Sequence, residues 1–204
     1  FGMGQAVRRS EDQRFITGAG FYATDYQPEG LTHAVLVRSP HAHATFTIDN
    51  IDDVRAMKGV LLAWSAADVA AFRPIPCQAM MDNSDGSKMV RTSYDVLAKG
   101  EVRHLGDAVA FIVAKTLAQA KDAAEALSVT YHDLPAAVGI EAAMAAGAPQ
   151  VWPEVKGNIA CDYHTGDKAK TDAAFAKADR VVSLRIINNR LVANYMEPRV
   201  CTAE

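Results

Sequence analysis

The sequence has few of the features that mark disulfide-rich, membrane-spanning or nucleic-acid-binding proteins. Its 204 residues include three cysteines, Cys77, Cys161 and Cys201, and no Cys-x-x-Cys or mixed Cys/His spacing that would indicate a zinc or iron–sulfur site. No apolar run is long enough to cross a bilayer. The net charge of −3 gives no reason to expect nucleic acid or an anionic membrane as a partner.

The absence of paired cysteines favours a reducing, cytoplasmic compartment. No basic-then-apolar signal segment opens the chain, although Phe1 in place of a methionine leaves a removed export leader open. Half of the residues are hydrophobic, which is ample for a core. The length fits one large domain or two small ones.

The clearest pattern is a strand, a helix and a second strand. The apolar run Ala108–Ala114 predicts a strand buried on both faces. Thr116 is a good N-cap, and apolar residues three and four apart predict a helix over Leu117–Leu127. Extended structure resumes at Val129–Tyr131 and ends before Pro135, because proline continues neither a strand ladder nor a helix.

Weaker patterns predict further elements on both sides. Upstream we expect strands at 30–39, 41–49 and 60–64, a helix at 51–57 capped by Asp49 or Asn50, a helix at 66–72 capped by Ser65, and a loop at 73–95. Downstream we expect helices at 140–146 and 171–178 and strands at 158–164 and 180–188.

Two groups of side chains are candidates for binding a metal ion. Alternation over residues 41–49 places His41 and His43 on one strand face, where they could supply two ligands or form a polar, hydrogen-bonded surface. Asp82, Asn83 and Asp85 resemble part of a calcium loop, but the glycine and the terminal glutamate are out of register. We interpret the first group as a strand face and the second as a solvated turn.

Several separate motifs occur in the order typical of one family. The central run LAKGEVRHLGDAVAFIVAKTLAQAKDAAEALSVTYHDLP resembles the α/β hammerhead domain of molybdenum hydroxylases, the xanthine dehydrogenase and aldehyde oxidase family. The other matching residues are Arg9, Glu11, Asp12, Arg14, Gly18, Tyr22 and Asp25, then Ser39, Pro40 and Ala42–Ala44, then Ala56, Gly59, Val60, Asp68 and Val69, and finally Asn188, Asn189, Arg190 and Met196–Arg199. Large chains of the aerobic carbon monoxide dehydrogenase type look most similar.

This resemblance implies an α+β fold, a hammerhead domain with a truncated second α+β segment. It implies an N-terminal arm at 1–19, the hammerhead domain at 20–135, a linker at 136–157 and the beginning of a molybdopterin-binding region at 158–204. We therefore expect the N-terminal structural domain of the large subunit of a molybdenum-dependent hydroxylase or dehydrogenase, not catalytic alone. The sequence stops in mid-pattern, so we expect a fragment of a longer subunit.

The chemistry that the resemblance implies lies elsewhere in that subunit. A molybdopterin-type cofactor would be held by later segments, and FAD and 2Fe-2S clusters by partner subunits or domains. Glu197 and Arg199 match a region of structural contacts in the family. We therefore predict no catalytic, cofactor-binding or metal-binding residue in this chain.

Two other functions remain open from the sequence. One is a free-standing small-molecule binding or protein-interaction module that uses the hammerhead fold. The other is a small metal-dependent enzyme that uses His33, His41 or His43 with an acid from the Asp82–Asp85 loop.

Overall fold

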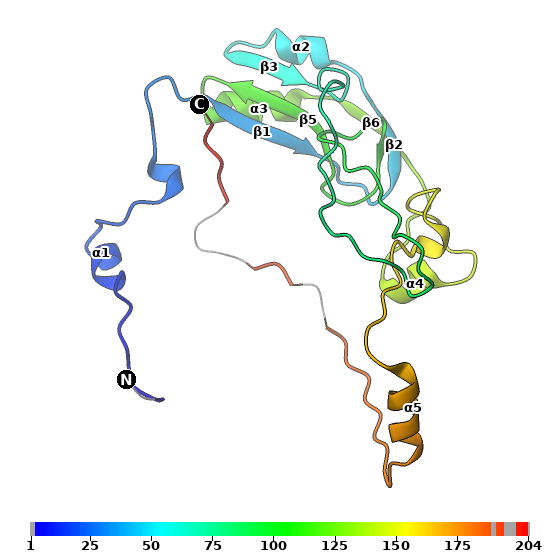
Figure 1. Cartoon of the computed structure of the whole chain (residues 1–204). Helices are drawn as coiled ribbons and strands as arrows, with labels where there is room; N and C mark the ends of the chain where they lie inside the picture. The colour runs from blue at the N-terminus through cyan, green and yellow to red at the C-terminus, as the bar shows by residue number, and fades with distance from the viewer. Residues whose placement is uncertain (1–2, 189–190, 194–198, 204) are drawn as a thin grey trace. The chain divides into compact units, whose positions relative to one another are not determined.

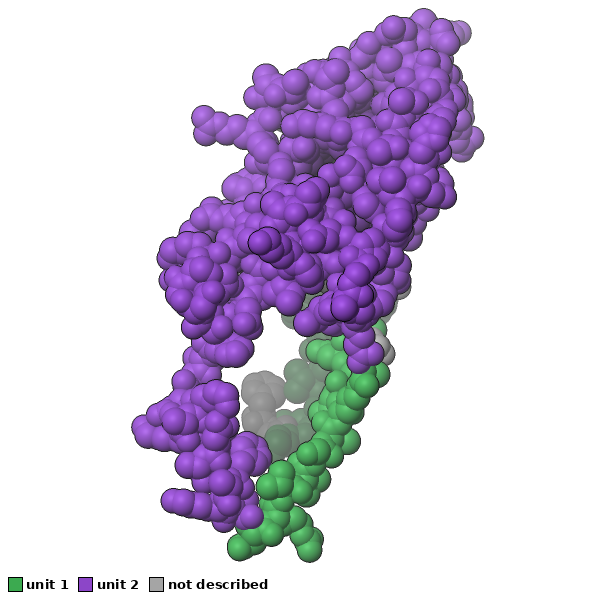
Figure 2. Space-filling view, turned by 90° about the vertical axis from the view of Figure 1, so that its right-hand side faces the viewer, with its two compact units in different colours: residues 1–31, 179–204 green, residues 32–178 purple. Residues whose placement is uncertain are grey.

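The computed structural model describes residues 3–188, 191–193 and 199–203 (Figure 1). The chain divides into two compact units, residues 32–178 and residues 1–31 with 179–204 (Figure 2). The larger unit holds all the strands of the described residues.

A first antiparallel sheet is built around the strand that the apolar run predicts. Strands β1 (His33–Arg38), β5 (Ala108–Ala114) and β3 (Val60–Trp64) pair in the order β1-β5-β3. The central strand β5 has the predicted bounds, and four of its seven residues are buried. The face that carries Ala110, Ile112 and Ala114 is buried, whereas Phe111 and Val113 on the opposite face are partly exposed, so the predicted burial on both faces is only partly observed.

A second antiparallel sheet contains β4 (Glu101–Val102), β2 (Ala44–Ile48) and β6 (Val129–Asp133), in the order β4-β2-β6. Strand β2 is shorter than the predicted strand at 41–49, so His41 and His43 precede it instead of lying on its face, whereas β6 runs two residues past the predicted Val129–Tyr131. Alternation in β2 is confirmed, because Ala44 and Phe46 are buried while the threonines between them are exposed.

Two helices cover one face of the first sheet. Helix α3 (Leu117–Ala126) begins as predicted, since the Thr116 side chain accepts a hydrogen bond from the backbone N–H of Gln119. In Figure 1 this helix lies behind β1 and β5. Buried alanines on α3 bring it close to the sheet, and α2 (Ile51–Arg55) joins it there. The resulting core contains Val54, Ala63, Ala110, Ile112, Ala123 and Leu127.

A second core cluster lies between the two sheets. It consists of Ala44, Phe46, Ala98, Val102 and Val109. Val37, Ile48 and Val129 pack against both clusters, so the two sheets share one continuous apolar interior. Burial of apolar surface on this scale is the main stabilising contribution to such a domain.

The segment after β6 carries three short helices: α4 (Ile140–Met144), η2 (Lys156–Asn158) and α5 (Lys168–Ala176). Helix α5 begins three residues before the prediction because Asp167 caps it, accepting from the backbone N–H of Lys170. The smaller unit contains α1 (Asp12–Ile16) and η1 (Ala23–Asp25), neither of which was predicted.

Three sequence predictions are wrong. Residues 66–72 form successive turns instead of a helix, because Asp68 accepts hydrogen bonds from the Ser65 backbone and hydroxyl and so holds a tight turn. No strand is formed by the described residues of 158–164 or 180–188.

The first of those two segments instead bonds to the long loop. Val90 N–H donates to the Ala160 carbonyl, and Ser84 N–H to that of Asp162. In the second segment the apolar side chains of Val182, Leu184 and Ile186 are all exposed. Alternation of apolar and polar residues alone therefore indicated extended backbone. A β-strand also needs a neighbouring strand with which to form backbone hydrogen bonds.

The fold class is α+β with two small antiparallel sheets, as predicted. The three cysteines are free thiols. No helix among the described residues has both the length and the apolar character needed to cross a membrane.

Candidate functional site

Histidine and carboxylate side chains meet at one end of the second sheet, where β2 begins and β6 ends. We call His41, His43, Glu101, Arg103 and Asp133 the histidine–carboxylate cluster. Antiparallel pairing brings them together, because Ala44 lies opposite Val102 of β4 and Asp133 of β6. The residues are far apart in sequence, so the register of the sheet positions them.

His41 forms the outer pair of the cluster. Its Nδ1 lies 2.6 Å from Asp133 Oδ1, and its ring stacks on Tyr131 with centroids 4.4 Å apart. Burial raises the pKa of Tyr131, and a hydrogen bond with the Ser39 side chain partly opposes that change. Asp133 is largely exposed, so the His41–Asp133 pair contributes little to stability.

His43 forms the inner pair. Its side chain is only 12 % exposed, and each ring nitrogen faces an oxygen. Nδ1 lies 2.8 Å from the backbone carbonyl oxygen of Pro135, and Nε2 lies 2.8 Å from Glu101 Oε1. The second oxygen of Glu101 accepts a hydrogen bond from Arg103 at 2.7 Å. A carboxylate between two basic side chains therefore stands at the centre of the cluster.

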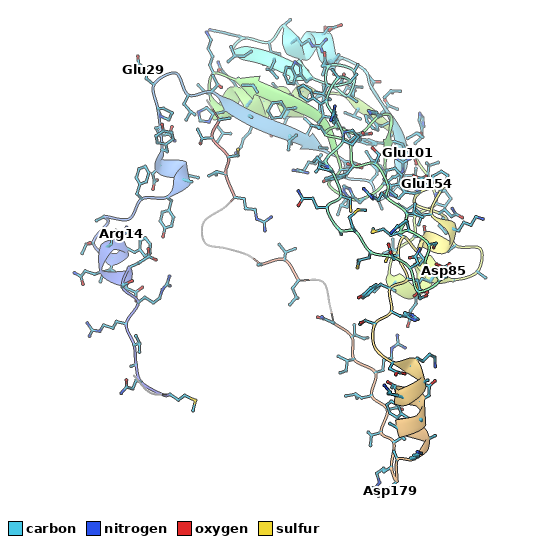
Figure 3. The ribbon with its side chains drawn as sticks, in the orientation of Figure 1. Arg14, Glu29, Asp85, Glu101, Glu154 and Asp179 are labelled. Carbon is cyan, nitrogen blue, oxygen red and sulfur yellow. The ribbon has the colours of Figure 1, made fainter. Side chains whose placement is uncertain are left out.

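Arg103 connects the cluster to the segment that follows β6. Its Nε donates to the Val151 carbonyl at 3.1 Å, and its guanidinium lies 4.1 Å from the centroid of the Trp152 ring. Glu101 is labelled in Figure 3, at the end of the sheets that lies beside the α4 region in this view. The planar guanidinium of this arginine donates hydrogen bonds to a carboxylate and a carbonyl while its flat face stacks on an aromatic ring. A lysine ammonium is a point charge without such a face, so lysine could not replace it here.

The chemistry of this cluster differs from that of a metal site. Both ring nitrogens of His43 already face oxygens, so the ring has no lone pair directed at a metal. The two histidines also point to different carboxylates. Across residues 3–188, 191–193 and 199–203, no three His, Cys, Asp or Glu side chains are grouped so that they could hold a metal ion.

The other sequence candidates are scattered. His33 lies on β1 of the first sheet, whereas His43 directly precedes β2 of the second sheet. Asp82 pairs with Lys88 at 2.6 Å, and Asp85 accepts from the backbone N–H of Ser87 at 2.9 Å. Hydrogen bonding by the serine lowers the pKa of Asp85. The structure does not bring these acids and the histidines together. Glu197 lies outside the described residues.

Sequence reasoning missed the partners of His43. Glu101 and Arg103 entered the sequence analysis only as part of the run that resembles the hammerhead domain, and Trp152 was placed in the linker 136–157. In an extended segment the Glu-x-Arg spacing would place both side chains on one face, which was an available signal. The partner histidine was not available, because 58 positions separate it from Glu101.

Comparison with known proteins gives a consistent result. A family model described as "Aldehyde oxidase and xanthine dehydrogenase, a/b hammerhead domain" matches residues 17–135. The nicotine 6-hydroxylase large subunit of Paenarthrobacter nicotinovorans is 31 % identical over 99 % of this chain and 24 % of its own length. The carbon monoxide dehydrogenase large chain of Afipia carboxidovorans is 32 % identical over 99 % of this chain and 25 % of its own.

A solved structure shows the same likeness. Quinoline 2-oxidoreductase from Pseudomonas putida 86 is 39 % identical, with a TM-score of 0.63 over 72 % of this chain and 18 % of that one. The chain thus spans about a quarter of the length of the curated relatives it matches.

Proposed function

The chain belongs to the aldehyde oxidase and xanthine dehydrogenase family, and from this membership we propose that it is the N-terminal structural part of a molybdenum-dependent hydroxylase or dehydrogenase large subunit. The observation that carries the proposal is the match over 99 % of this chain to about a quarter of two such large chains. The carbon monoxide dehydrogenase or aldehyde oxidase type is the variety we favour.

The domain organisation is part of the same proposal. Residues 1–19 form an N-terminal arm, 20–135 the hammerhead domain, 136–157 a linker, and 158–204 the beginning of the molybdopterin-binding region. The family match to residues 17–135 supports the proposed limits of the hammerhead domain at residues 20 and 135. Val151 and Trp152 contact Arg103, so these contacts join the proposed linker to the hammerhead domain.

The molybdenum cofactor does not fit the residues described here. The histidine–carboxylate cluster has no ring nitrogen of His43 available for a ligand, and no grouped metal donors occur in the described part of the chain. Because this chain matches only about a quarter of the length of its large-subunit relatives, we propose that the rest of the large subunit holds the cofactor. We assign FAD and 2Fe-2S clusters to partner subunits, and we place the assembly in the cytoplasm, which free thiols favour.

An apolar sheet face supports a structural role. Phe111 points away from α3, because Ala110 and Ile112 on either side of it enter the core beneath that helix. Leu36 and Trp64 lie opposite Phe111 on the neighbouring strands, and Phe72 packs edge-on against Trp64. Leu36 is 39 % exposed and Phe72 is 55 % exposed. We propose that the remaining three quarters of the subunit covers this face.

The first experiment is isolation of the native protein from its source with an antibody against this chain. We expect a polypeptide about four times as long as this chain, the ratio given by the relatives' lengths, with bound molybdenum and with flavin and iron–sulfur subunits. A native polypeptide of 204 residues without molybdenum would overturn the proposal. It would leave the free-standing binding module as the interpretation to pursue.

The second experiment tests the apolar face within the full subunit. Leu36→Lys places a charge on the face, and we expect a lower yield of molybdenum-loaded complex. Thr45→Lys, on an exposed position of β2, is the matched control and should assemble normally. Normal assembly of Leu36→Lys would show that another surface carries the contact.

A further inference from the structure

The inner part of the histidine–carboxylate cluster has a property that a fold-supporting ion pair does not need. His43 stands between two oxygens that only accept hydrogen bonds: the Pro135 carbonyl oxygen and the Glu101 carboxylate, each at 2.8 Å. A neutral imidazole has one N–H and satisfies one of them. The ring satisfies both only when both nitrogens carry protons.

Arg103 decides which partner holds the proton. Its NH2 group donates a charge-assisted hydrogen bond to Glu101 Oε2 at 2.7 Å, so Glu101 stands here as the acceptor. An ionised carboxylate cannot donate to Nε2, so His43 must be the donor. Glu101 is then shared between two cations, His43 and Arg103.

Nearby charged groups leave this assignment intact. Asp133 of β6 is engaged by His41 at 2.6 Å. Asp107 accepts from the backbone N–H of Arg103 at 3.2 Å and lies 3.8 Å from His104. His132 lies opposite Thr45 in the register, one position from Asp133. Among the described residues, Glu101 is therefore the carboxylate that His43 contacts.

Arg103, on the side of the cluster away from His43, contacts a turn in the segment that follows β6. Arg103 bonds to the Val151 carbonyl and stacks on Trp152, as described above. Asn158 closes the same turn, because its Oδ1 accepts from Val151 N–H and its Nδ2 donates to the carbonyls of Ala143 and Pro149. His43 also contacts the beginning of that segment, because its Nδ1 lies within hydrogen-bond distance of the Pro135 carbonyl oxygen.

We propose that doubly protonated His43, with Glu101 and Arg103, is a pH-sensitive clasp that fastens residues 135–158 to the second sheet. Loss of one ring proton removes a hydrogen bond and one of the two positive charges that hold Glu101. Arg103 is then less firmly oriented toward Val151 and Trp152, and the turn opens more often. The clasp goes beyond the proposed structural role, and it holds whether or not the chain belongs to a molybdenum enzyme.

The first test measures backbone amide exchange of residues 150–158 by mass spectrometry on the native protein, at about pH 6 and about pH 9, across the range in which histidine titrates. After correction for intrinsic rates, we expect exchange about tenfold faster at the higher pH, the size of one charge-assisted hydrogen bond. In His43→Gln we expect fast exchange at both pH values. His41→Gln, which removes the exposed His41–Asp133 pair, should behave as wild type.

The second test reads the ring itself and does not depend on a His43 variant that folds. Exchange of the ring C2 hydrogen reports imidazole protonation, and a chymotryptic peptide spanning residues 37–46 carries both histidines. In His41→Gln, His43 is the one histidine left on that peptide. A two-proton ring at about pH 6 supports the clasp. A one-proton ring there, or exchange of 150–158 that is equal at both pH values, overturns it.

Discussion

The Asn50 side-chain oxygen accepts a hydrogen bond from the backbone N–H of Ser128 at 2.8 Å. The Asn50 amide also donates to the Ala126 carbonyl at 3.0 Å. The residue is the one of the two predicted cap candidates, Asp49 and Asn50, that occupies the N-cap position of α2, yet its side chain makes no capping bond there. It instead joins the start of α2 to the connection between α3 and β6, so one side chain links three elements.

We predict that Asn50→Ala lowers the free energy of unfolding by about 1 to 3 kcal/mol, because a backbone N–H and a carbonyl lose their partners. The measurement is the urea midpoint of the purified chain. Asp53→Ala, on an exposed position of the same helix, should change it by less than about 0.5 kcal/mol. Equal effects of the two substitutions would contradict the linking role.

Gly59 has a φ of 89°, and a Cβ added there would collide with the side chain of Gln119 on α3. Gly59→Ala should therefore lower the free energy of unfolding by about 1 to 3 kcal/mol, mostly from backbone strain, because the amide end of the flexible Gln119 side chain can move aside. Gly100→Ala is the matched control, since its φ is 74° and its surroundings are open. It should cost only the strain, about 1 to 2 kcal/mol. Adding Gln119→Ala to Gly59→Ala should bring the loss down to that level.

Ala123 lies on the face of α3 that packs on the first sheet and is fully buried. Ala123→Leu forces extra volume into a filled core, so we expect a loss of about 1 to 3 kcal/mol, read from chemical denaturation. Ala118→Leu, on the exposed side of the same helix, adds the same atoms outside the core and should be nearly neutral. If the two variants were equally stable, the close packing of α3 would be disproved.

The Asp68 carboxylate is expected to make the stability of the fold depend on pH in the acidic range. Partial burial opposes its ionisation, but hydrogen bonds from Ser65 and the charge and hydrogen bonds of Arg55 outweigh this, and the pKa of Asp68 is lowered. Arg55 reaches both carboxylate oxygens, at 2.7 and 2.8 Å.

Because the folded pKa lies below the unfolded value of 3.8, this carboxylate stabilises the fold above that pH, and the contribution is lost as pH falls through the folded pKa. We expect Asp68→Asn to be less stable than wild type at neutral pH and to lose less stability on acidification from about pH 5 to about pH 3. Thermal unfolding across this range is the measurement. An Asp68→Asn profile parallel to that of wild type would refute the assignment.

Much of the hammerhead fold could be predicted from periodicity alone. The run Ala108–Ala114 and the cap at Thr116 gave β5 and the start of α3 correctly, because a continuous apolar strand and a capped helix leave strong local patterns. Residues 66–72 and 180–188 misled the prediction. Their patterns are short, and whether such a stretch becomes a turn, a strand or neither depends on partners that the pattern does not contain.

The sequence by itself determined the family, the α+β class and the elements whose apolar residues repeat regularly. Only the tertiary structure decided what His43 does, since its two partners lie 58 and 92 positions away in the chain. A strand pattern fixes which face a side chain occupies. The pairing register and the path of the chain after β6 decide what stands opposite that face, and both depend on long-range contacts that no local pattern records.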